Sequence, residues 1–314
     1  MATTKSKKAV KKSSKPASKS AVTKKTKVAK VVEAPVATQT SKNPFKGFFA
    51  RKYDANETIL TIFKSPKIYG AIVGEVVGTM LLTIILLTLG ANPLYVMFGA
   101  IAISAAVLAF SGAHLNPLVT VGMMASRRIS VIRGVVYMLA QVLGAWFAYL
   151  ISSAFINTAD GAATAELQSM TAIPSEKFWV VTMIEFFAAT MIAFFFARAH
   201  AYKRSTLTFA AIYGTGICTA ILTAVVISSS LGMQNNFIAN PAVALMYQVL
   251  PTGGENFGVV LGDIFQALAV YVILPMIGGV IGFAISDVAT KLSGNPVCAC
   301  GAGCPCKDEA KAKK

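Results

Sequence analysis

SGAHLNPLVTVG (Ser111–Gly122) places an Asn-Pro pair, Asn116-Pro117, inside a long apolar region. Asn-Pro usually marks a turn at a protein surface, so a pair in these surroundings needs a special explanation. The apolar stretch that starts at this pair ends near residue 126. It would form about 15 Å of helix, which is half of the ~30 Å thickness of a bilayer core. The stretch therefore predicts a helix that enters a membrane without crossing it, provided that the rest of the chain is a membrane protein.

The composition is that of a membrane protein. Of the 314 residues, 55% are hydrophobic and 13% are charged, whereas soluble chains carry about 25% charged residues. The mean hydropathy is +0.64. The formal net charge of +16 comes mostly from residues 1–52, which contain fifteen Lys and Arg residues and one acid, Glu33.

Four segments follow from this distribution. Residues 1–42 contain many lysines and no aromatic residue, which predicts a disordered cytoplasmic tail. Residues 43–67 begin with NPFKGFFARKY, whose mixture of basic and aromatic residues predicts an interfacial segment. Residues 68–288 form the membrane domain, and residues 289–314 form a second cytoplasmic tail, rich in Cys and Lys.

The basic N-terminal tail has three readings: a solvated tail, an anchor to anionic lipids, or a nucleic-acid contact. An attraction of about 1 kcal/mol for each basic residue near an anionic surface makes the lipid anchor easy once the domain is inserted, and the solvated tail stays open beside it. Nucleic-acid binding is the weakest reading because the tail is held at a membrane, and no nucleic-acid partner is expected.

Six apolar stretches are long enough to cross a bilayer as helices. They are approximately 69–90, 94–111, 133–156, 178–199, 206–228 and 258–286. If the N-terminus is cytoplasmic and the spans alternate, every one of the 29 Lys and Arg residues except Lys177 falls on the cytoplasmic side, as the positive-inside rule requires. The sequence thus predicts a multi-pass integral membrane protein with both termini in the cytoplasm, in a plasma or an internal membrane.

The two halves of the domain, 68–157 and 178–288, resemble each other. Each places one carboxylate early in its first span, Glu75 or Glu185, and each has an Asn-Pro pair before a short apolar stretch, the second at about 240–250. Because each half has three spans, the halves enter the bilayer in opposite directions. The predicted fold is an all-α membrane protein with six transmembrane helices and two re-entrant half-helices in an inverted repeat.

The paired half-helices predict a pore. Asn is a favoured N-cap and Pro a favoured first helical residue, so each half-helix begins near the bilayer centre, where irregular backbone must be buried in protein or line a cavity. The predicted central constriction consists of Asn116, Pro117, Leu118, Asn240, Pro241 and Ala242. The predicted pore-lining carbonyls belong to Gly112, Ala113, His114, Phe237, Ile238 and Ala239. The positive ends of two helix dipoles would repel cations there, while neutral hydrogen-bonding solutes would pass.

The carboxylates of Glu75 and Glu185 have two possible interpretations. Acids within a membrane are candidate ion or proton sites. Alternatively, each accepts hydrogen bonds from the backbone of the re-entrant loop, and the symmetric placement of the two residues favours this reading. His114 is likewise interpreted as a brace for its loop rather than a gate.

Several motifs resemble the major intrinsic protein family, the aquaporins and aquaglyceroporins. They are SGAHLNP, NPA (Asn240–Ala242), AQVLGAW (Ala140–Trp146) and LPMIGGVIGFAISD (Leu274–Asp287). The resemblance extends from about Ile68 to Asp287. It implies an aquaporin-like channel domain, usually a homotetramer with one pore in each subunit.

Two residues depart from the family pattern. Leu118 stands where the first signature usually has Ala, and Val243 stands where an Arg usually follows the second signature. The resemblance implies an outer selectivity constriction formed by Val96, Ser228, Phe237 and Val243, with Phe98 in place of Val96 if the second span has a gap. This ring is apolar and has few donors, so water, glycerol, urea, ammonia and hydrogen peroxide all remain candidate permeants.

The second tail contains four thiols within CACGAGCPC, at Cys298, Cys300, Cys304 and Cys306. Thiolates favour soft metals such as zinc or copper(I), but palmitoylation or an inert tail are the alternatives, and no resident cofactor is expected. The predicted function is a passive channel for water or small uncharged solutes that excludes ions, without enzymatic activity. A non-conducting membrane scaffold and an ion-coupled secondary transporter are the rival readings.

Overall fold

The computed structural model describes residues 57–89, 92–158, 175–201, 205–232, 237–249 and 261–293. The predictions for residues 1–42, for Asn43–Asn56 and for the four tail cysteines concern residues outside these ranges.

Six long helical segments cross the fold, as predicted. They are α2 (Pro66–Leu89), α3 (Pro93–Ser111), α5 (Val131–Thr158), α6 (Phe178–Ala201), α7 (Thr206–Ser230), and a composite last segment of α9 (Leu261–Leu268), the π-helical η3 (Ala269–Ile273) and α10 (Leu274–Leu292). Two short elements, α1 (Ile59–Lys64) and the 3₁₀ turn η1 (Ser175–Lys177), precede α2 and α6. Each long segment is apolar enough and long enough to span a bilayer.

The last segment differs from its prediction in two ways: it ends later, and it contains a π-helical turn. The helix continues to Leu292 rather than stopping at residue 286. The approximate apolar stretch gave no reason to extend the helix past Asp287, but this carboxylate is buried in an ion pair with Arg128, so the helix can continue. The π-helical turn lies just before Pro275, whose missing N–H interrupts the regular hydrogen-bond ladder.

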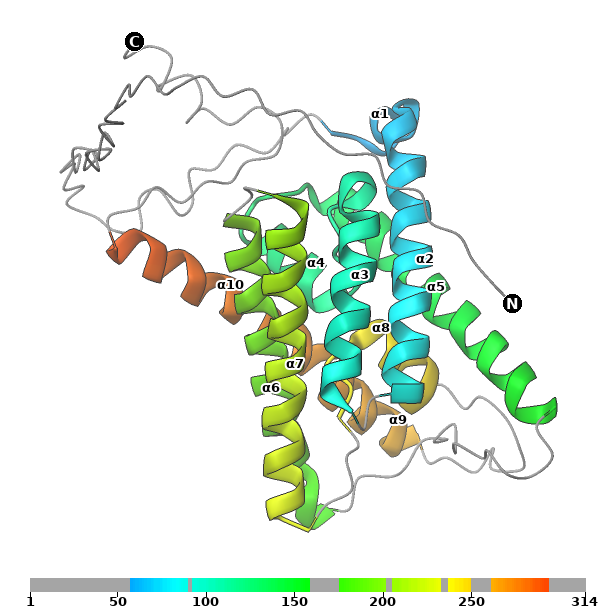
Figure 1. Cartoon of the computed structure of the whole chain (residues 1–314), viewed down its shortest axis with the longest axis vertical. Coiled ribbons are helices and arrows are strands. Elements are labelled where there is room, and N and C mark those ends of the chain that lie inside the picture. The colour runs from blue at the N-terminus through cyan, green and yellow to red at the C-terminus, as the bar shows by residue number, and fades with distance from the viewer. Residues whose placement is uncertain are drawn as a thin grey trace, which may run out of the picture. The chain divides into compact units, whose positions relative to one another are not determined.

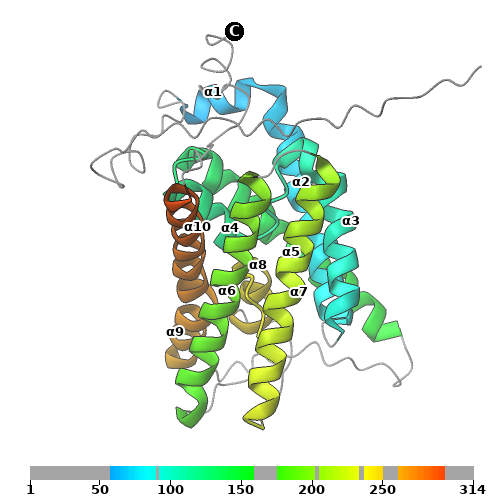
Figure 2. The same cartoon turned by 60° about the vertical axis from the view of Figure 1, so that its left-hand side comes forward.

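The two half-helices lie inside the bundle. α4 (Pro117–Ala125) is nearer the end that carries α1, and α8 (Pro241–Ala244) is nearer the opposite end (Figures 1 and 2). The second stretch is helical as far as Val249, but its later part, η2 (Leu245–Val249), is π-helical. The packing of η2 against η3 brings the two π-helical segments together.

Helix pairs equivalent in the two repeats make the most extensive contacts, α2 with α5 and α6 with α10. Each pair contains a glycine where the backbones meet. A Cβ at Gly144 would lie 2.4 Å from the carbonyl oxygen of Val76, and one at Gly282 would lie 2.4 Å from that of Thr190. Close approach of this kind is the usual means of helix association in membranes.

The distribution of polarity supports a membrane environment. Large apolar side chains such as Trp179 and Phe98 are exposed on the outside of the bundle. Charged and polar side chains, including Glu75, Gln141 and Glu185, are fully buried inside it. An apolar exterior around a polar interior is expected where lipid is the solvent.

Candidate functional site

Each half-helix begins with the predicted Asn cap. The Asn116 side-chain oxygen accepts a hydrogen bond from the backbone N–H of Leu118 at 3.1 Å, and the Asn240 oxygen accepts one from Ala242 at 3.1 Å. In both cases Pro occupies the first turn, where its missing N–H costs nothing. The Asn-Pro pairs are therefore helix starts inside the bundle and not surface turns.

The two caps are joined by reciprocal hydrogen bonds. Asn116 Nδ2 donates to the carbonyl oxygen of Ala239 at 2.9 Å, and Asn240 Nδ2 donates to the carbonyl oxygen of Leu115 at 3.2 Å. Each carboxamide thus caps its own helix with its oxygen and holds the opposite loop with its nitrogen. The positive ends of α4 and α8 consequently meet at one place in the fold.

Unusual backbone conformations bring the chain into each cap. Ala113, Leu115 and Ala239 have φ of 54°, 56° and 42°, and Gly112 has φ of 88°. Non-glycine residues in this region are disfavoured, and the surrounding structure must hold them there. The strain lies in the residues immediately before the two Asn-Pro pairs.

Glu75 holds the first loop. Its carboxylate accepts the backbone N–H groups of His114 at 3.0 Å and Leu115 at 2.8 Å. It also accepts a hydrogen bond from Gln141 Nε2 at 2.7 Å, and the same nitrogen lies 2.9 Å from Thr120 Oγ1 on α4. One buried cluster therefore joins α2, α5 and the half-helix.

Glu185 holds the second loop with fewer partners. Its two oxygens accept the backbone N–H groups of Ile238 at 2.6 Å and Ala239 at 2.8 Å. The two glutamates thus bind equivalent positions of the two loops, and both side chains are fully buried. These partners of the two carboxylates are hydrogen-bond donors, mostly backbone N–H groups of the re-entrant loops. These are the contacts of a side chain that holds a loop in place.

His114 contacts the protein on every side. Its backbone carbonyl accepts a hydrogen bond from Tyr213 Oη at 3.0 Å, and its Nδ1 lies 3.2 Å from Thr120 Oγ1. Its ring meets those of Tyr137 and Phe196 edge to face. The carbonyls of His114 and Ala239, both predicted to line the pore, therefore already accept hydrogen bonds within the protein.

The residues of the expected outer constriction are buried to different extents. Val96, Ser228 and Val243 are almost fully buried, and Phe237 is partly buried. Val96 and Phe237 belong to the main apolar cluster. Val243 lies in a second cluster with Ala145, Ala242, Met246 and Tyr247. The described contacts do not join the four residues in one cluster, so the ring stays a prediction.

Leu118 is fully buried in the main cluster. A Cβ at Gly279 on α10 would lie 2.3 Å from the Leu118 carbonyl oxygen, so the two backbones touch here. The half-helix is thus seated directly against α10.

A buried ion pair fixes the other end of α4. Arg128 Nη2 lies 2.6 Å from Asp287 Oδ1, and both side chains are almost completely inaccessible to solvent. The guanidinium also lies over the ring of Phe283, 4.9 Å from its centroid. Sequence reasoning missed this pair and the polar contacts of Gln141, because a single polar residue in an apolar span does not reveal its partner.

The described ranges contain no group of three or more His, Cys, Asp or Glu residues placed to hold a metal ion. The polar groups of the site instead provide amide donors and carbonyl acceptors between two helix starts.

Comparison with known proteins is consistent with this geometry. The family model of the major intrinsic proteins matches residues 62–285. Aquaporin-1 of Sus scrofa is 49% identical over 51 residues, which cover 16% of this chain and 19% of the relative. Aquaporin-1 of Homo sapiens is 45% identical over 51 residues, with the same coverage of 16% and 19%. The matched segment thus spans about a fifth of the length of these relatives.

One solved structure, the X-ray structure of the aquaglyceroporin from Plasmodium falciparum, is similar with a TM-score of 0.51. The alignment covers 70% of this chain and 96% of that protein at 20% sequence identity. At this identity the likeness supports a common fold.

Proposed function

The chain belongs to the major intrinsic protein family, and from this premise we propose that it forms a passive pore for small uncharged solutes, water among them. The reciprocal pair of asparagines is the observation that carries this proposal. Each Nδ2 has two hydrogens, and one of them is used in the bond to the opposite loop. The second hydrogen of each amide is the donor that a permeating solute meets at the centre.

Ion exclusion follows from the same arrangement. The N-termini of α4 and α8 each carry about half a positive charge, and they face each other across the two caps. A cation loses its hydration at this point without gaining a compensating negative charge. A neutral solute loses less, because the Asn amides and loop carbonyls replace its hydrogen bonds.

The outer part of the pore determines which neutral solutes pass. Val243 brings no donor and no charge to the position after the second Asn-Pro-Ala signature, and Val96 brings none to the expected ring. A ring of this kind favours solutes that need few hydrogen bonds, such as ammonia or hydrogen peroxide, and it also admits water, glycerol or urea according to its width. The names aquaporin-1 and aquaglyceroporin, carried by the similar proteins, support water and glycerol as the first solutes to test.

The proposed arrangement in the membrane has both chain ends in the cytoplasm and four identical subunits, each with its own pore. In this orientation almost all Lys and Arg residues fall on the cytoplasmic side, as the positive-inside rule requires, and this supports the proposal. The tetramer is the usual assembly of the family that the sequence motifs resemble.

Stopped-flow measurements on reconstituted proteoliposomes test the proposal. Under gradients of water, glycerol and urea, vesicles containing the protein should change volume faster than protein-free vesicles for at least one of these solutes. Val243→Arg should shift the ratio of water to glycerol flux, while Val243→Met, a long uncharged substitution, separates the effect of charge from that of size.

Two results would contradict the pore. Permeabilities equal to those of bare lipid for every solute tested, ammonia and hydrogen peroxide included, would favour the non-conducting scaffold. Transport that depends on a proton or sodium gradient would favour the secondary transporter.

A further inference from the structure

The short helix α1 lies at one end of the bundle. It ends at Lys64, and α2 begins at Pro66, so only Ser65 separates it from the first membrane-spanning helix. Ser65 is extended, with ψ of 124°, and α1 lies across the end of α2 instead of continuing it (Figure 2). A helix that turns aside at the end of a membrane span is in a position to lie along the bilayer surface.

Three apolar side chains of α1 are exposed. Ile59 is 63% exposed, Leu60 76% and Phe63 39%, whereas Ile62 is 2% exposed and packs in a small apolar cluster. Because successive residues turn by about 100°, the three exposed side chains share one arc of the helix. Thr61 lies on the opposite side of the helix from this arc.

Basic residues flank the apolar face. Lys64 at the end of α1 and Lys67 at the start of α2 are both exposed. Tyr69, also exposed, donates a hydrogen bond from its hydroxyl to the carbonyl of Phe63 at 3.2 Å. Apolar side chains bordered by lysines and a tyrosine are typical of helices that lie in the headgroup region of a membrane.

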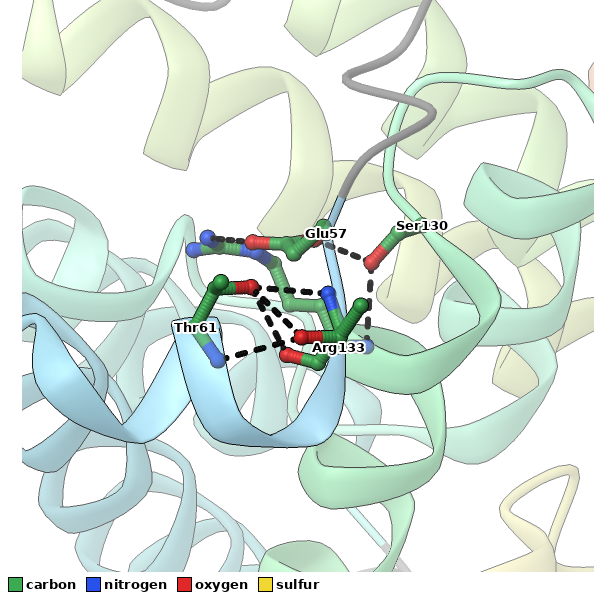
Figure 3. Close-up of polar contacts among 5 residues, drawn as sticks. Glu57, Thr61, Ser130 and Arg133 are labelled. Carbon is green, nitrogen blue, oxygen red and sulfur yellow. Dashed lines mark hydrogen bonds and ion pairs between the residues drawn. The ribbon is translucent and has the colours of Figure 1, made fainter.

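A polar cluster, here called the Glu57 latch, joins the start of α1 to the start of α5. Its members are Glu57, Ser130 and Arg133. Arg133 Nη2 lies 2.5 Å from Glu57 Oε1, and the Ser130 hydroxyl donates to Glu57 Oε2 (Figure 3). Ser130 Oγ also accepts the backbone N–H of Arg133 at 3.1 Å, and a capping box between Thr58 and Thr61 completes the first turn of α1.

The latch is built on an ionised Glu57. Burial opposes ionisation of this carboxyl, but hydrogen bonds from Arg133 and Ser130 and the charge of Arg133 outweigh it and lower the pKa of Glu57. The cluster therefore stays intact at neutral pH.

We propose that the exposed face of α1 inserts into the headgroup region of the adjacent leaflet, beside anionic lipids, and that the Glu57 latch sets its orientation. In water, three neighbouring apolar side chains would stay solvated at a cost of about 25 cal/mol for each Å² of apolar surface. In the headgroup region they meet acyl chains, while Lys64 and Lys67 meet lipid phosphates and carboxylates. This role is independent of which solute the pore conducts.

Tryptophan quenching in the reconstituted full chain tests the orientation. Replacing Trp146 and Trp179 by Phe provides a background for Leu60→Trp as the probe and Thr61→Trp as the matched control. The control keeps the bond from its own backbone N–H to the Thr58 hydroxyl but loses the Thr61 hydroxyl that accepts the Thr58 N–H, so one half of the capping box remains. The tryptophan at position 60 should be quenched by phospholipids brominated high on their acyl chains, because interfacial helices sit about 5–10 Å into the headgroup boundary. The control should respond to aqueous iodide instead.

Two further comparisons test the lipid charge and the latch. Replacing part of the phosphatidylcholine by phosphatidylserine should increase lipid quenching at position 60, and the increase should be lost in the double variant Lys64→Gln/Lys67→Gln. Glu57→Gln should reduce the difference between positions 60 and 61. Ile59→Trp is a second probe of the same face in case Leu60→Trp does not fold.

The proposal is overturned if iodide quenches position 60 as strongly as position 61, since the face would then point to water. It is equally overturned if neither quencher reaches position 60, since protein would then cover it. If phosphatidylserine does not change the quenching at position 60, the part of the proposal that concerns anionic lipids is wrong. If Glu57→Gln does not change the difference between positions 60 and 61, the part that concerns the Glu57 latch is wrong.

Discussion

Removing the carboxylate of Glu185 should open the second re-entrant loop. In Glu185→Ala, the backbone N–H groups of Ile238 and Ala239, now held at 2.6 and 2.8 Å, lose their acceptor. Each unpaired buried donor costs about 1–3 kcal/mol, so the loss amounts to about 2–6 kcal/mol at the entry to α8. Ala239 also has φ of 42°, and in the variant its strained conformation is held by the Asn116 bond to its carbonyl oxygen without the bond to its N–H.

A graded series makes this prediction specific. Glu185→Gln keeps one acceptor oxygen but turns an amide donor toward the other N–H, so it should lose about 1–3 kcal/mol. Thr182→Val, one turn earlier on α6, is the control: the Thr182 hydroxyl is buried and has no hydrogen-bond partner within the described ranges. Glu185→Ala should lose the most stability and flux and Glu185→Gln should lose less, while Thr182→Val should stay close to wild type.

Two assays compare the three variants with wild type. Stopped-flow light scattering of proteoliposomes measures solute flux, and thermal unfolding in detergent, followed by tryptophan fluorescence, measures stability. Both should fall in the same order, because one set of bonds supports the loop and the fold. If Glu185→Ala conducts and unfolds like wild type, the carboxylate does not hold the loop. If stability is unchanged while a proton-driven flux disappears in Glu185→Gln, Glu185 is a proton site.

Further predictions concern the packing and the latch. Asp287→Ala should lower the free energy of unfolding by about 3–5 kcal/mol, because it breaks a buried ion pair by removing the carboxylate 2.6 Å from Arg128 Nη2. Chemical denaturation of the double variant with Arg128→Met should recover part of this loss. Gly282→Ala should destabilise by about 1–3 kcal/mol, since its Cβ would meet the backbone of α6 at 2.4 Å. Gly70→Ala, with nothing within 4 Å of its Cβ, should be neutral by the same thermal assay. The pKa of Glu57 is lowered from its ordinary value of 4.5, so its contribution is present above the unfolded-state pKa and is lost as the pH falls through the folded-state pKa. Lipid quenching of the tryptophan probe on α1 should therefore hold at every pH above 4.5 and weaken only below it, and Glu57→Gln should abolish this dependence.

The sequence predicted the spans and both half-helices because each depends on local properties. Twenty apolar residues have few alternatives in a membrane, and Asn-Pro before a short apolar stretch specifies a helix start in itself. The six crossings and the start of α4 and α8 required no knowledge of tertiary contacts.

What the sequence could not provide was the pairing of polar groups. The partners of Glu75 include Leu115, forty residues away, and those of Arg128 include Asp287, 159 residues away. Nothing in the local pattern connects such residues. The continuation of α10 past Asp287 has the same basis, since the charge of Asp287 is neutralised by Arg128 in the segment after α4.

The reciprocal asparagine bonds also bear on how the protein is made. Asn116 bonds a residue 123 positions later, and Asn240 bonds one 125 positions earlier. Contacts between such distant parts of a chain form late, and during synthesis the first half emerges long before the second exists. Until the ribosome has delivered the second repeat, Asn116 has no carbonyl to bind and the strained residues before it have no opposing loop. If synthesis stops after the first repeat, that repeat should be inserted in the membrane with its re-entrant loop unpaired. Cellular quality control can then recognise it as incomplete, and it should not conduct.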